Sequence, residues 1–113
     1  MTKPEDILVV TTNDISGYEV VEVYGEVFGL IVRSRNIFSS IGTSFRAIVG
    51  GESGGLTKLL VDSRNLAMDR LRQEAADKGA NAILAMRFDT GDIYQIMNEV
   101  AAYGTAVKIQ KKK

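Results

Sequence analysis

The residues best suited to chemistry in this sequence are four arginines: Arg33, Arg35, Arg46 and Arg64. Arg33 ends the apolar run Leu30-Ile31-Val32, where an unpaired charge would be costly. Two interpretations stay open for Arg33. It forms an ion pair with Asp62 or Glu52, within or between subunits, or it belongs to an anion site where subunits meet. The ion pair is the favoured interpretation, because most partly buried charges in proteins are structural.

A glycine-rich loop offers a second kind of chemistry. Gly50 and Gly55 have the spacing of a phosphate-binding loop, but Leu56 stands where that motif requires lysine, and Glu52 would repel a phosphate. The loop is therefore either a small-anion site formed with the start of the next helix, or a connector whose glycines permit close packing, which we favour. The candidate ligand-binding residues are accordingly Arg33, Arg46, Gly50, Gly51, Ser53 and Arg64.

Metal and catalytic chemistry have few suitable side chains. The sequence has no cysteine and no histidine, so zinc or copper would find neither thiolate nor imidazole. Asp89 and Asp92 flank an expected turn and could offer oxygens to Ca²⁺ or Mg²⁺, although carboxylates are common in turns for structural reasons. A serine–lysine pair such as Ser53 and Lys58 has no informative spacing. No catalytic residue and no cofactor is identified.

Composition limits the class of protein. The 113 residues are 45% hydrophobic and 25% charged, which fits one globular domain over residues 1–113. Lys+Arg and Asp+Glu both number 14, so a formal net charge of zero favours neither nucleic acid nor an anionic membrane as a partner. The acidic start, Glu5-Asp6, differs from a signal peptide, and without cysteine we expect a cytoplasmic protein.

The elements that must position these residues follow from periodicity. Strands are predicted over residues 7–12, 18–33, 82–88 and 94–109, with a turn at residues 90–92. Helices are predicted over residues 36–48 and 56–78, the second ended by Gly79. Gly25 and Gly29 are expected to mark bulges or bends. One stripe of the long helix should face the sheet: Leu56, Leu60, Ser63, Ala67, Leu71 and Ala75.

These elements predict an α+β fold, a small antiparallel sheet of about four strands packed on two helices in the order ββααββ. Parts of two strands, residues 27–32 and 82–86, are apolar on both faces. Two helices can cover only one face of the sheet. We therefore expect a second copy of the chain to cover the other face, so that the protein is a homo-oligomer.

Several short segments together resemble one family: Ile31-Val32-Arg33, Phe45-Arg46-Ala47-Ile48-Val49-Gly50-Gly51, Lys58-Leu59, Ser63-Arg64, Gly79-Ala80-Asn81-Ala82-Ile83 and Tyr103-Gly104-Thr105-Ala106-Val107. They cover nearly the whole chain and are similar to the YbjQ-like family of uncharacterised bacterial and archaeal proteins, which is labelled for heavy-metal binding. The resemblance implies a dodecin-like subunit that assembles into a pentameric ring.

Two hypotheses for function follow. The first is a non-catalytic homo-oligomeric ring that binds a small ligand, an anion or a metal ion. The second is an enzyme whose active site lies between subunits and is built from arginine, serine and carboxylates. The lack of histidine and of any catalytic motif favours the first.

Overall fold

The computed structural model describes residues 2–34, 54–93 and 97–113. Its elements are η1 (Pro4–Asp6), β1 (Leu8–Val9), β2 (Tyr18–Ser34), α2 (Gly54–Asp77), β3 (Ala82–Ile93) and β4 (Met97–Lys111). The predicted long strand and long helix are thus confirmed to within two residues at each end. The helix expected over residues 36–48 lies outside the described residues.

The sheet is mixed, so the expectation of an antiparallel sheet is wrong at one edge. The strand order is β1-β3-β4-β2. β4 pairs antiparallel with both β2 and β3, whereas β1 pairs parallel with β3 through Leu8↔Ala82 and Val9↔Ile83. The reason is the long helix, because α2 returns the chain to the end of the sheet where β1 begins, and β3 therefore starts beside β1 and runs in the same direction.

β3 continues where the sequence predicted a turn. Thr90, Gly91 and Asp92 pair with Val100, Glu99 and Asn98 of β4, and the strand ends only at Ile93. Cross-strand pairing has overridden the local turn preference of these residues. The irregular part of β3 lies earlier, where the register shifts between Leu84 and Arg87 and Ala85 has a φ of 54°.

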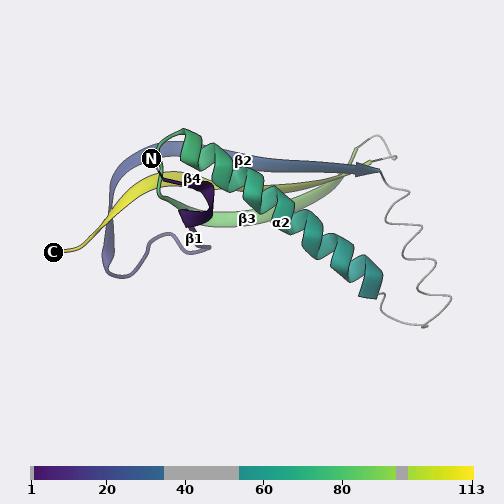
Figure 1. Ribbon diagram of the computed structural model, residues 1–113, viewed down its shortest axis with the longest axis horizontal. Helices are drawn as coiled ribbons and strands as arrows, with labels where there is room; N and C mark the ends of the chain where they lie inside the picture. The colour runs from purple at the N-terminus through teal and green to yellow at the C-terminus, as the bar shows by residue number, and fades with distance from the viewer. Residues whose placement is uncertain (1, 35–53, 94–96) are drawn as a thin grey trace.

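α2 runs obliquely across one face of the sheet (Figure 1). Four residues of its predicted stripe are fully buried, namely Ser63, Ala67, Leu71 and Ala75, whereas Leu60 is exposed. The contact is close because Gly29 of β2 has no side chain. A Cβ built there would lie 2.6 Å from Leu71 N and nearer still to the Ala67 carbonyl oxygen. Gly29 therefore permits helix–strand contact and does not mark a bend.

The predicted bulge at Gly25 is confirmed. The register of β2 shifts between Val23 and Gly25, and Gly25 has a φ of 100°, a conformation that glycine adopts without steric strain.

The second face of the sheet is covered at one end by the chain itself. Val10 and Ile15, which follow β1, pack on a cluster formed by Ala82, Leu84, Val107 and Ile109. Backbone hydrogen bonds from Val10 N to Ile83 O (3.0 Å) and from Met86 N to Val10 O (2.9 Å) hold this segment in place. The apolar second face of residues 82–86 thus needs no other copy of the chain, contrary to the expectation from sequence.

Candidate functional site

Arg33 lies near the end of β2, on the face that α2 covers. It is half-buried, and its Nε donates a hydrogen bond to Ser63 Oγ at 3.3 Å. Ser63 is the fully buried polar residue of the helix stripe, so this bond satisfies a hydroxyl that has left water. Asp62, one of the two carboxylates expected to pair with Arg33, instead lies 3.5 Å from Lys58 Nζ.

Arg64 follows Ser63 in α2 but contacts a different strand. Its guanidinium lies 5.2 Å from the centre of the Phe88 ring of β3, in a cation–π arrangement. Neighbouring residues of α2 thus contact two different strands, Ser63 through Arg33 of β2 and Arg64 through Phe88 of β3. The other candidate ligand-binding residues, Arg46, Gly50, Gly51 and Ser53, lie outside the described residues.

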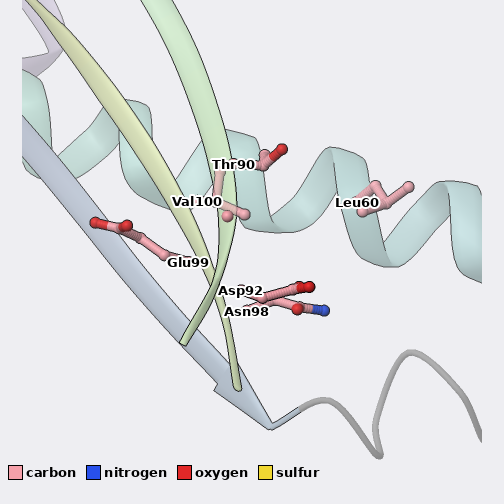
Figure 2. Close-up of a pocket in the computed structure, with 7 residues that line it drawn as sticks. Leu60, Thr90, Asp92, Asn98, Glu99 and Val100 are labelled. Atoms are coloured by element: carbon pink, nitrogen blue, oxygen red, sulfur yellow. The ribbon is translucent and has the colours of Figure 1, made fainter. Parts of the chain in front are cut away.

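A hollow of about 500 Å³ lies between α2 and the ends of β3 and β4. Figure 2 shows Thr90, Asp92, Asn98 and Val100 on the side that faces Leu60, while Glu99 points away. With its amide nitrogen turned toward β3, as its neighbours require, Asn98 donates to Asp92 Oδ1 at 2.7 Å. The hollow is therefore mixed in character, and its carboxylate has an amide partner.

The suggestion that Asp89 and Asp92 share a cation is not supported by their positions. They lie three residues apart in β3, and successive side chains of a strand point to opposite faces. Asp92 lines the hollow beside α2, whereas Asp89 lines a second hollow on the opposite face of the sheet. Two carboxylates on opposite faces cannot bind one ion.

That opposite face carries a contiguous apolar surface, which we call the open face. Its large side chains are 38–53% exposed and come from alternate positions: Phe28, Leu30 and Val32 of β2 and Tyr103 of β4. The rings of Phe28 and Tyr103 lie 6.2 Å apart and are tilted by 32°. Exposed aromatic and aliphatic side chains that adjoin one another are typical of a contact surface.

Carboxylates surround the open face. Glu26, Asp89 and Glu99 line the same hollow as Phe28 and Tyr103. The basic residue of this region, Arg87, donates through Nη1 to the backbone oxygens of Thr11 and Met86. Sequence reasoning missed this acidic rim because its members come from three strands. The alternation of Glu26, Phe28, Leu30 and Val32 along β2 was the signal available.

The described residues do not form a metal centre of their own. Among residues 2–34, 54–93 and 97–113, no three Asp, Glu, His or Cys side chains are placed to hold one ion. The sequence supplies neither thiolate nor imidazole, the donors that soft heavy metals prefer. In the same parts of the chain, no helix is both long enough and apolar enough to span a bilayer.

In the part of the chain that the structure describes, these features define an α+β fold in which one long helix covers one face of a four-stranded mixed sheet and no described element covers part of the other face. The chain belongs to the YbjQ family, whose description reads "Putative heavy-metal-binding" and whose sequence pattern matches residues 7–110.

Its relatives include the UPF0145 protein YjfJ of Lactococcus lactis, 59% identical over 107 residues, which are 95% of this chain and 98% of that protein. A UPF0145 protein of Streptomyces griseus is 56% identical over 94% of this chain and 88% of that protein. A crystal structure of a protein of unknown function of the DUF74 family, from Pediococcus pentosaceus, aligns with a TM-score of 0.56. The alignment covers 92% of this chain and 98% of that one at 14% identity, and it therefore supports the fold alone.

Proposed function

We propose that this chain is a non-catalytic subunit that assembles with copies of itself into a closed ring, which the family resemblance puts at five subunits. The observation that carries the proposal is the open face, where Phe28, Leu30, Val32 and Tyr103 form an apolar surface that the described chain leaves in water. Burying such a surface in a neighbouring copy stabilises an assembly in proportion to the apolar area removed from water.

The acidic rim favours a head-to-tail ring over a two-fold dimer. A two-fold pairing of open faces would bring both sets of Glu26, Asp89 and Glu99 into one interface, where like charges repel. A head-to-tail contact instead places the open face of one copy against a different surface of the next, and such contacts form a ring when the rotation from copy to copy closes.

The same chain offers a basic surface of suitable sign. Lys111, Lys112 and Lys113 are all exposed at the end of β4. Lys111, which pairs with Tyr18, lies eight residues beyond Tyr103 along β4. At about 3.3 Å per strand residue, it is about 26 Å from the open face of its own chain. The acidic rim and the lysine run can therefore meet only between copies. A small ligand or ion bound by the ring would lie where subunits meet.

The test compares two valines of nearly equal exposure. Val32 lies on the open face and is 53% exposed, and Val61 lies on α2 and is 50% exposed. We expect native mass spectrometry of the unmodified protein to give a multiple of 12.3 kDa. Val32→Lys should raise the dissociation constant of the assembly by about 100-fold, because it puts a charge into an apolar contact, and pairing with Glu99 opposite does not repay the desolvation of both groups. Val61→Lys should leave it unchanged.

Two results would refute the proposal. One is an unmodified protein that stays monomeric and folded at micromolar concentration. The other is a Val32→Lys variant that assembles as tightly as Val61→Lys, since the copies would then associate through another surface. Lys112→Glu/Lys113→Glu tests the partner surface separately and should weaken assembly without changing the melting curve of the subunit.

A further inference from the structure

β2 has one edge that no described strand covers. It is the last strand in the sheet order and pairs with β4 along its inner edge from Tyr18 to Ser34. An unpaired strand edge presents backbone N–H and C=O groups to which another chain can add a strand. The risk is highest at residues 27–32, which are six residues without charge or proline.

Side chains of α2 and of Lys78, the residue directly after it, bind backbone groups along this edge. Arg70 Nη1 donates to Leu30 O at 2.6 Å, and Glu74 Oε2 accepts from Phe28 N at 3.0 Å. Lys78 Nζ donates to Glu26 O at 3.4 Å and also lies 4.0 Å from Glu74 Oε1. Each charged group thus meets a backbone group of the opposite polarity.

The spacing of the two elements explains this match. Four helix residues advance about 6 Å and two strand residues about 6.6 Å, so side chains at every fourth helix position meet alternate strand residues. The contacts run from Arg70 to Lys78 on the helix side and from Leu30 back to Glu26 on the strand side, so the two elements run antiparallel. Gly29, in the middle of the contact, brings the helix backbone close enough for the short Glu74 side chain to reach the edge.

The upstream part of β2 and the opposite edge of the sheet, at β1, are protected from strand addition in other ways. Upstream of Glu26, the register of β2 shifts twice, between Val20 and Glu22 and between Val23 and Gly25. Bulges of this kind twist an edge away from regular pairing. At the opposite side of the sheet, β1 contributes only two regular residues. The flat apolar stretch of β2 is therefore the part of the edge that needs protection.

We propose that Arg70, Glu74 and Lys78 form a side-chain cap that closes the edge of β2 to strand addition by another copy of this chain. The cap leaves the open face free, so that face stays available for contact while the edge of the sheet is closed to extension. This inference rests on the three hydrogen bonds and holds whichever surface joins the subunits.

The experiment compares two double variants of α2. Arg70→Met/Glu74→Leu removes two members of the cap, and Lys58→Met/Asp62→Leu removes an exposed ion pair of the same helix. Each removes one base and one acid, so net charge stays the same. At a protein concentration too low for strand addition, we expect the amide of Phe28 to exchange with solvent at least about 10-fold faster in the cap variant, by NMR, and not in the control. At higher concentration, sedimentation should show species larger than the unmodified assembly only for the cap variant.

Equal exchange rates at Phe28 in both double variants, or an unchanged sedimentation profile for the cap variant, would overturn the proposal. If the cap variant does not fold, two single variants replace it. Glu74→Gln keeps an oxygen acceptor and should protect the Phe28 amide, whereas Glu74→Leu has no acceptor and should not. Equal exchange in these two variants would also overturn the proposal.

Discussion

Replacement of Gly29 by alanine should separate the long helix from the sheet. The added Cβ would lie 2.6 Å from Leu71 N, whereas ordinary contacts begin near 3.4 Å, so the helix must retreat by at least about 0.8 Å, and further to clear the Ala67 carbonyl oxygen. Both of the nearest groups, Leu71 N and the Ala67 carbonyl, belong to the helix backbone, and no side-chain rotation can relieve the contact. The whole buried stripe from Ser63 to Ala75 would lose packing with it.

The magnitude combines two opposing effects. Overpacking typically costs about 1–3 kcal/mol, and a backbone clash belongs at the upper end. Alanine recovers about 0.5–1 kcal/mol because it restricts the unfolded chain more than glycine does. The net loss in the free energy of unfolding should be about 2 kcal/mol. For a chain of 113 residues this corresponds to a fall of about 8 °C in Tm.

Gly91→Ala is the matched control for this measurement. Gly91 also lies in a strand without a left-handed backbone, and a Cβ there would meet nothing within 4 Å. It should show only the favourable effect on the unfolded chain. Thermal unfolding of both variants at one protein concentration gives the comparison. If Gly29→Ala and Gly91→Ala have the same melting temperature, the close approach of helix and strand is not what stabilises this fold.

Three further predictions concern single residues. Ala67→Leu should lower the free energy of unfolding by about 1–3 kcal/mol in denaturant titrations, because Ala67 is fully buried against β2; an unchanged midpoint would mean that the helix does not pack there. Ala85→Gly should raise it by about 0.5 kcal/mol, since Ala85 has a φ of 54°, and a loss of stability would show that its methyl group packs productively. Burial, the hydrogen bond to Glu22 and the charge of Glu22 raise the pKa of Tyr24 above 10.0. The stabilisation linked to the neutral phenol is therefore complete below pH 10.0 and is lost as the pH rises through the higher folded-state pKa. Tyr24→Phe should reduce the loss of folding stability at alkaline pH. A stability profile identical to that of the unmodified protein at alkaline pH would contradict this.

Local patterns in the sequence were sufficient for the regular elements. The extent of β2, the stripe from Ser63 to Ala75 and the stop at Gly79, which has a φ of 90°, were all predictable. These features depend on residues a few positions apart, whose spacing directly reflects the helical or extended period. The bulge at Gly25 belongs to the same class of local signal.

The choice of site residues was only partly within reach of the sequence. Arg33 and Arg64 were singled out by residue type, but the structure gives them separate partners, Ser63 of α2 for Arg33 and the Phe88 ring of β3 for Arg64. The acidic rim of the open face could not be predicted, because Glu26, Asp89 and Glu99 are brought together only by the pairing of three strands.

Tertiary structure decided the features that join distant parts of the chain. The parallel pairing of β1 with β3, the extension of β3 through Thr90–Asp92 and the cover that Val10 gives to Leu84 all depend on long-range contacts. So does the cap of α2 on the edge of β2, where a spacing of four residues in a helix meets a spacing of two in a strand. Each spacing is ordinary in the sequence, and only the packing of the two elements gives them a common repeat.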